Sequence, residues 1–230
     1  PYGEERYKNP LTTDRRMPHV SERERQMPEQ EIGRLLRIAV EDKSVISLGP
    51  GEPDFPAPAP IVALTKKYAN QCNHYSPPGG LKELREAIAR KLKKENKIDT
   101  SPENIVVTCG SQEALLIAAA CTLDPSEQVI LPDPSYMGFL PTFELFNAGI
   151  TTLPVHESEG FSINPDELER AIDPKKTKVL MINTPANPTG TVLSKKILEQ
   201  IADIAIEHDL LVFSDEAYEK LVYGKPHVSM

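Results

Sequence analysis

Residues 178–190 read KVLMINTPANPTG, an apolar run that ends abruptly in a polar segment with two prolines. The apolar run predicts a buried strand. Proline fixes a backbone angle and removes an amide donor, so residues 183–190 can neither extend the strand nor begin a helix. The stretch therefore predicts a rigid polar corner at the carboxyl end of a buried strand.

The chain around this corner alternates between strand and helix patterns. The predicted strands are residues 104–108, 127–132, 150–155, 178–183 and 210–215. The segments between them predict helices at residues 110–123, 135–149 and 164–172, and a further helix that begins after Ser194. Asn164 is the expected N-cap of the third, with Pro165 in its first position. Apolar strands alternating with helices indicate an α/β fold of three layers around a mainly parallel sheet.

The N-terminal part of the chain follows a different pattern. Residues 1–28 are charged, are interrupted by proline and lack apolar periodicity, which favours an extended arm. A helix is expected from about Glu29, a short strand at residues 45–48, and an amphipathic helix around residues 81–92.

Composition excludes several classes of protein. The formal net charge of -8 argues against a nucleic-acid partner, because phosphate binding needs a basic face. We expect no membrane span and no signal peptide, and the scattered histidines give no support to a metal site. Cys72, Cys109 and Cys121 lack metal-ligand spacing and are interpreted as buried thiols in a reducing cytosol.

Three unusual segments follow predicted strands: TCGSQEA (108–114), NTPANPTG (183–190) and SDEAY (214–218). In an open parallel sheet, ligands bind beyond the carboxyl ends of the strands. Because these ends share one edge, we expect the three segments to converge there.

Each segment allows two interpretations when it is taken alone. Gly110, Ser111 and Gln112 open a helix whose free N–H groups and dipole favour an anion, although Ser111 could simply be an N-cap. Asp215 ends a buried strand, so its carboxylate needs a partner, which is either a loop hydrogen bond or a cationic ring nitrogen. Tyr218 could bring a phenol to the same ligand. Together the segments predict a pocket for a phosphorylated heteroaromatic cofactor.

Four motifs then mark a family resemblance: GEPDF (51–55), HYSPPGG (74–80), NPTG (187–190) and SDEAY (214–218). In this order they resemble the class I/II aminotransferases, fold-type-I enzymes that use pyridoxal 5′-phosphate (PLP). The similarity extends from about Glu29 to Tyr223. It implies an arm with part of a small domain in residues 1–50 and a PLP-binding large domain in residues 51–230.

The resemblance implies roles for the residues around the cofactor ring. Asp215 matches the partner of the protonated pyridine nitrogen, and Tyr136 matches an aromatic residue stacked on the ring. Asn187 and Tyr218 match residues that hydrogen-bond the phenolic oxygen. Asn187 also contacts the substrate's carboxylate in this family, together with the backbone around Gly51. We further expect a cis peptide bond between Asn187 and Pro188.

The resemblance also implies a phosphate site and a partner subunit. Gly110, Ser111 and Gln112 match the phosphate cradle, in agreement with the argument from the helix terminus. Tyr75 matches a tyrosine that reaches the cofactor phosphate of a neighbouring subunit. A homodimer with shared active sites is therefore expected.

The family's catalytic lysine, which binds PLP as a Schiff base, has no counterpart in this sequence. Residues 194–196 (SKK) precede the Asp215 strand and are interpreted as a solvated first helical turn. Lys220 and Lys225 follow Tyr218 too closely. We therefore expect the Schiff-base lysine beyond Met230, an incomplete sheet and small domain, and a segment that is inactive and poorly soluble on its own.

The sequence thus predicts a cytoplasmic aminotransferase that moves an amino group between an α-amino acid and a 2-oxo acid. Two alternatives stay open: a PLP-dependent β-lyase or synthase of the same fold, and a non-catalytic PLP-binding relative. Members acting on aspartate, alanine, aromatic and branched-chain amino acids share all four motifs.

Overall fold

The computed structural model describes residues 21, 31–49, 51, 55–224 and 226–230. The chain divides into two compact units, residues 1–64 and residues 65–230. The first contains helix α2 (Glu31–Glu41), which agrees with the helix expected from about Glu29. Helix α3 (Ala59–Tyr68) spans the division between the units. Apart from Ser21, the predicted arm lies outside the described residues.

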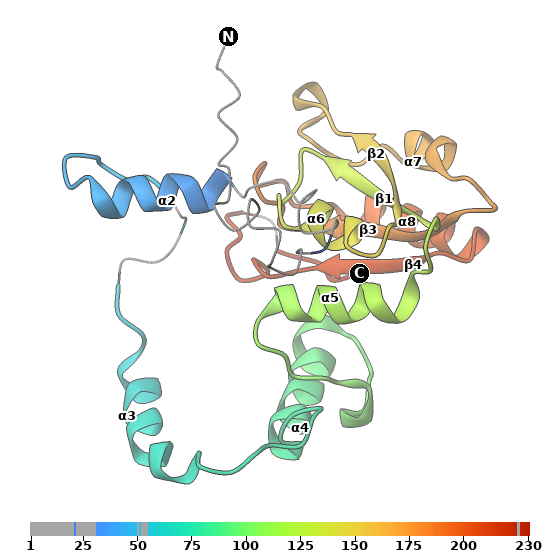
Figure 1. The fold of residues 1–230 in the computed structure, drawn as a ribbon. Coiled ribbons are helices and arrows are strands. Elements are labelled where there is room, and N and C mark those ends of the chain that lie inside the picture. The colour runs from blue at the N-terminus through green and yellow to red at the C-terminus, as the bar shows by residue number, and fades with distance from the viewer. Residues whose placement is uncertain (1–20, 22–30, 50, 52–54, 225) are drawn as a thin grey trace, which may run out of the picture. The chain divides into compact units, whose positions relative to one another are not determined.

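The second unit is built on a four-stranded sheet in which every neighbouring pair of strands is parallel (Figure 1). Its strands are β1 (Gln128–Asp133), β2 (Gly149–Pro154), β3 (Thr177–Asn183) and β4 (Leu211–Asp215). Their spatial order is β2-β1-β3-β4. The sheet confirms the predicted α/β class, because parallel neighbours require a crossover between them.

Two helices of the second unit, α4 (Lys82–Lys91) and α5 (Ser111–Thr122), precede the sheet in the chain. Three others, α6 (Phe139–Glu144), α7 (Pro165–Ala171) and α8 (Lys195–Glu207), connect its strands. Both expected caps are present. The Asn164 side chain accepts hydrogen bonds from the first turn of α7, and the Ser194 hydroxyl accepts one from Ile197 N–H.

Alternate residues of the strands fill two separate cores. On one face, Ile130, Leu180 and Ile182 pack in a buried cluster with residues of α7 and α8. On the other face, Val129 and Met181 join a cluster with residues of α5 and α6. The period of two along each strand thus produces the expected three layers, with a helix pair on each side of the sheet.

Several predicted elements differ from the structure. Residues 104–108 and 45–48 are not strands, because neither segment pairs with a described strand. The helix predicted over residues 135–149 is confined to α6, which begins at Phe139 after a turn. The prediction of buried thiols is also wrong: the three cysteines are free but exposed, Cys72 and Cys109 outside the regular elements and Cys121 in α5.

No helix among the described residues is both long and apolar enough to cross a membrane.

Candidate functional site

Two of the three unusual segments meet at the carboxyl edge of the sheet. The corner NTPANPTG begins at Asn183, the last residue of β3, and SDEAY contains Asp215, the last residue of β4. Asn183 and Asp215 are register partners in the parallel ladder. The expected convergence of these two strand ends is therefore confirmed.

An open cavity of about 440 Å³ adjoins this edge. Its volume falls within the roughly 300–1,000 Å³ range of small-molecule sites. It is lined by Ser111, Gln112, Ala114, Leu115, Ala118, Tyr136, Phe139, Met181, Phe213, Ser214, Asp215, Glu216 and Ala217. The cavity thus joins the start of α5 to the end of β4 and brings four predicted site residues together: Ser111, Gln112, Tyr136 and Asp215.

The start of α5 has the features of an anion site. Its N-cap is Gly110, whose φ of 84° requires a residue without a side chain, and Ser111 is the first helical residue and not the cap. Within the described part of the chain, the backbone N–H groups of Ser111 and Gln112 have no acceptor. Free N–H groups at a helix N-terminus attract negative charge.

The side chain of Gln112 is held by α6. Its Nε2 donates to Thr142 Oγ1 at 2.6 Å, and that hydroxyl donates to the carbonyl oxygen of Gly138 at 2.9 Å. The Gln112 side chain therefore ties α5 to α6, and the backbone N–H of Gln112 is the group left for an anion.

Gly138 is a site residue that sequence reasoning missed. A Cβ atom at this position would lie 2.4 Å from Cε1 of Tyr136 and 2.9 Å from Oε1 of Gln112. Tyr136 also contacts Phe139 edge-on, with ring centroids 5.3 Å apart. The signal for Gly138 was its place two residues after Tyr136 in PDPSYMGF, but only the fold shows the close approach.

Asp215 is partly buried and has one carboxylate oxygen to spare. Its Oδ1 accepts a hydrogen bond from Ala217 N–H at 3.0 Å. Its Oδ2 has no donor among the residues that the structure describes. The loop hydrogen bond expected on structural grounds is therefore present, and one oxygen is still free for a cationic group.

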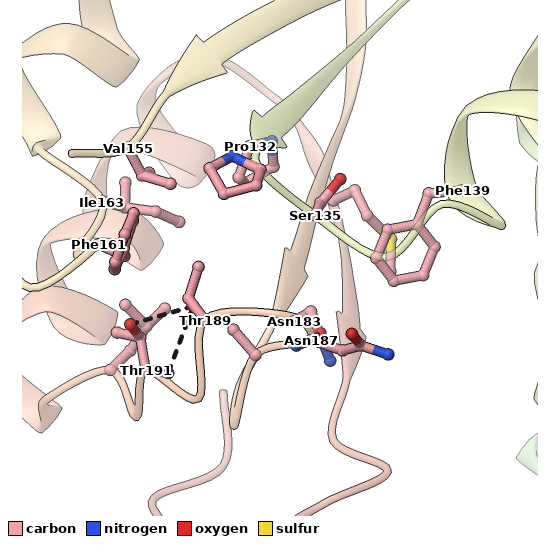
Figure 2. Close-up of a pocket in the computed structure, with 14 residues that line it drawn as sticks. Pro132, Ser135, Phe139, Val155, Phe161, Ile163, Asn183, Asn187, Thr189 and Thr191 are labelled. Atoms are coloured by element: carbon pink, nitrogen blue, oxygen red, sulfur yellow. Dashed lines mark hydrogen bonds between the residues drawn. The ribbon is translucent and has the colours of Figure 1, made fainter. Parts of the chain in front are cut away.

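Asn187 lies at a smaller crevice of about 30 Å³, which Asn183, Thr189 and Thr191 also line (Figure 2). Phe139 and Met181 line both hollows, which places the crevice next to the larger cavity. The Asn187–Pro188 bond is cis, as predicted. The Asn187 side chain forms no hydrogen bond with any described residue, so its amide can still meet a ligand.

Four predicted residues are outside the lining of both hollows. Gly110, the N-cap of α5, directly precedes the lining residue Ser111. Tyr218 is partly buried in the turn after β4. Tyr75 has a fully exposed side chain. Gly51 belongs to the first unit, whereas all the residues that line the cavity belong to the second unit.

Glu216, at the rim of the cavity, has a pKa below its ordinary value. Burial would raise this pKa, but hydrogen bonds outweigh burial. The donors are His227 Nε2 at 2.8 Å, Ser229 Oγ at 2.6 Å, Met230 N–H at 3.1 Å and Ser214 Oγ at 2.8 Å. This cluster fastens the end of the described chain to the turn after β4.

Comparison with known proteins agrees with this geometry. The family model described as aminotransferase class I and II matches residues 43–230. The chain belongs to the class I and II aminotransferase family, whose members are PLP-dependent.

Two curated relatives show how far the similarity extends. The aspartate aminotransferase of Pyrococcus abyssi is 46% identical over 199 residues, which cover 84% of this chain and 50% of the relative. The aromatic-amino-acid aminotransferase 2 of Thermococcus litoralis is 43% identical over 206 residues, 89% of this chain and 53% of the relative. The chain thus spans about half the length of the curated relatives it matches.

A solved structure of the same fold is the aspartate aminotransferase of Thermus thermophilus with maleate. It superimposes with a TM-score of 0.89 at 34% identity, over 93% of this chain and 57% of that one. The aspartate aminotransferase fold expected from the sequence is thereby confirmed over the matched region.

Proposed function

We propose that this chain forms the PLP-binding part of an aminotransferase, which moves an amino group between an α-amino acid and a 2-oxo acid. One observation carries the proposal. A single cavity combines an anion-attracting helix start, the ring of Tyr136 and the unpaired oxygen of Asp215. These are the three groups that a phosphate, an aromatic ring and a cationic ring nitrogen require.

The phosphate would lie at the start of α5. Gly110 lets an anion approach the backbone, and Ser111 and Gln112 offer N–H groups aligned with the helix dipole. The hydrogen bond from Gln112 to Thr142 supports this role, because it holds the start of α5 against α6 and keeps those N–H groups in place.

Asp215 would bind the ring nitrogen of the cofactor. A carboxylate beside a pyridine nitrogen keeps a proton on that nitrogen, because the opposite charge stabilises the cationic form. Bound PLP supplies an electron sink for the substrate's α-carbon. Tyr136 would cover one face of the ring and exclude water from it.

The remaining roles concern the phenolic oxygen and the substrate. Asn187 and Tyr218 would donate hydrogen bonds to the phenolic oxygen, and Asn187 would also bind the substrate's carboxylate. The uncommitted amide of Asn187 supports its part in this. The proton on the substrate's α-carbon would be moved by a lysine beyond Met230.

The assembly and location are part of the same proposal. Residues 51–230 would be the large domain and residues 1–50 the arm and part of the small domain. Tyr75, whose side chain is fully exposed, would reach the phosphate site of a partner subunit in a homodimer. The three exposed free cysteines support a reducing, cytoplasmic location.

A β-lyase or synthase is the second candidate, because the same groups would hold PLP for that chemistry. The names of the relatives, aspartate and aromatic-amino-acid aminotransferase, favour transamination.

The test uses the complete polypeptide that carries residues 1–230. We expect it to bind PLP with a visible absorbance band that borohydride abolishes, and to convert an α-amino acid to its 2-oxo acid in a single half-reaction. Release of ammonia with loss of a β-substituent would instead establish the lyase. Absence of PLP binding would refute the proposal.

Asp215→Asn tests the ring-nitrogen contact in the same polypeptide. Asparagine can still accept the Ala217 N–H but has no charge, so PLP affinity should fall about 10- to 100-fold, the equivalent of about 1.5–3 kcal/mol. Asp203→Asn, at an exposed position on α8, is the matched control and should bind PLP as the wild type does. Equal PLP affinities for the two variants would refute this role for Asp215.

A further inference from the structure

Asn183 occupies a special place at the edge of the sheet. It is the last residue of β3 and the first of the polar corner, directly opposite Asp215 in the ladder. Its side chain lies beside Asn187 at the crevice (Figure 2).

Both ends of the Asn183 amide are used. Its Oδ1 accepts a hydrogen bond from Asn187 N–H at 2.7 Å. Its Nδ2 donates to the carbonyl oxygen of Asp215 at 3.0 Å. The Asn183 side chain thus connects the backbone of Asn187 to the backbone of Asp215.

The chemistry of this link suits asparagine. The Asn187 N–H needs an acceptor, and the Asp215 carbonyl oxygen can accept a second hydrogen bond beside the one from Thr184 N–H. A neutral amide meets both from one short side chain. An aspartate could accept from Asn187, but its carboxylate would face the Asp215 carbonyl oxygen without a proton to donate. A leucine or alanine would leave both backbone groups without this partner.

We propose that Asn183 is a positioning residue, which sets Asn187 and Asp215 at one fixed spacing so that both can meet the same cofactor. This inference rests on the proposed function for the roles of Asn187 and Asp215. Thr184 N–H also donates to the Asp215 carbonyl at 3.0 Å, so the strand ends stay paired without the amide. What the amide adds is the connection to Asn187, four residues further along the corner.

The experiment compares Asn183→Ala, Asn187→Ala and the double variant in the complete polypeptide loaded with PLP. The readout is the pH midpoint at which the visible absorbance of the bound cofactor changes. Loss of a donor to the phenolic oxygen disfavours its anion, so Asn187→Ala should raise this midpoint. Asn183→Ala should raise it too, and the double variant should rise no further than Asn187→Ala alone.

Thr184→Val is the matched control. The Thr184 hydroxyl accepts a hydrogen bond from Leu193 N–H at 3.0 Å in the same corner, and the residue is fully buried. This variant should lower stability but leave the midpoint at the wild-type value. An equal shift of the midpoint in Thr184→Val and Asn183→Ala would overturn the proposal, since any loosening of the corner would then suffice.

A second readout needs no cofactor. In PLP-free polypeptide, Asn183→Ala should accelerate hydrogen exchange at the Asn187 amide and leave the Thr184 amide, which keeps its Asp215 acceptor, at the wild-type rate. Unchanged exchange at Asn187 would overturn the positioning role, whether or not the wild type binds PLP. Absence of PLP binding by the wild type would refute the proposed function separately.

Discussion

At the scale of single residues, the wall of the cavity depends on a close contact between Gly138, Tyr136 and Gln112. The glycine leaves room for the edge of the tyrosine ring, and Gln112 reaches past it to Thr142. This contact fixes where the ring of Tyr136 can lie, and so how an aromatic ligand could stack on it.

Gly138→Ala is therefore expected to displace the Tyr136 ring. The added Cβ would lie 2.4 Å from Tyr136 Cε1, and overpacking of this kind costs about 1–3 kcal/mol of stability. We expect a lower urea midpoint and weaker PLP binding, measured by chemical unfolding and by absorbance titration.

Gly79→Ala is the control for this prediction. Apart from its chain neighbours, no residue in the described part of the chain has an atom within 4 Å of the position that this Cβ would occupy, so stability and PLP affinity should both stay near the wild type. Wild-type PLP binding by Gly138→Ala would contradict the importance of the contact.

Individual residues differ in how far the sequence revealed them. The need of Asp215 for a partner could be predicted, because a carboxylate directly after an apolar strand has few ways to avoid an unpaired buried charge, and the Ala217 N–H is such a partner. Asn183 and Gly138 could not be assigned roles. Their importance lies in contacts with groups that the sequence pattern does not place, such as the Asp215 carbonyl and the tyrosine ring.

At the scale of elements, the start of α7 is defined by local chemistry. The Asn164 Oδ1 accepts hydrogen bonds from Asp166 N–H at 3.0 Å and Glu167 N–H at 3.4 Å. Asn164→Ala should lower stability by about 0.5–2 kcal/mol, measured by urea unfolding, and Asn164→Asp should retain most of the wild-type stability. Because α7 lies outside the cavity lining, PLP affinity should stay unchanged in both. Equal stability of the alanine and aspartate variants would contradict the capping role.

The cluster around Glu216 predicts a pH dependence. Its pKa is lower in the folded protein than the ordinary value of 4.5, so its contribution to stability is complete above that pH and is lost as the pH falls through the folded pKa. Glu216→Gln should therefore be less stable than the wild type near neutral pH, and the difference should shrink as the pH falls below 4.5.

Urea unfolding of both proteins between neutral and acidic pH measures this difference. Glu157→Gln, in the short 3-10 helix Glu157–Glu159, is the control at an exposed carboxylate and should follow the wild type throughout. A constant gap between Glu216→Gln and the wild type at every pH would contradict the prediction.

The sequence mispredicted a strand at residues 104–108, because a strand also needs a neighbouring strand with which to pair. Residues 104–108 have the apolar pattern of a strand, but Val107 N–H bonds to the carbonyl oxygen of Gly79, which is in a turn and not in a strand. A strand needs a neighbour for its hydrogen bonds, and apolar periodicity does not show whether the neighbour is present.

At the scale of the whole molecule, the proposed homodimer with shared sites makes a prediction about mixed subunits. If Tyr75 serves the site of the partner, a dimer of one Tyr75→Ala subunit and one Asp215→Ala subunit contains one site with both residues intact. Each mixed dimer should therefore have about half the activity of a wild-type dimer. Because free exchange in an equal mixture makes about half of the dimers mixed, the mixture should recover about a quarter of the wild-type activity. Steady-state assays before and after subunit exchange measure this recovery.

No recovery despite demonstrated subunit exchange would show that Tyr75 acts within its own subunit or not at all. The control is a mixture of Asp215→Ala with Asp215→Asn, which has no intact site in any combination, so subunit exchange should not raise its activity.

The sequence alone determined the alternation of strands and helices from β1 onward, the caps Asn164 and Ser194, and the polar segments after β3 and β4, because these depend on periodicity and on chemistry within a few residues. It also carried the family resemblance through short motifs. Tertiary structure alone decided which apolar runs became strands and that Asn183 joins Asn187 to Asp215. It also decided that Gly138 makes room for Tyr136. These features depend on hydrogen bonds and steric contacts between segments distant in the chain, which exist only once the sheet and its helices have packed.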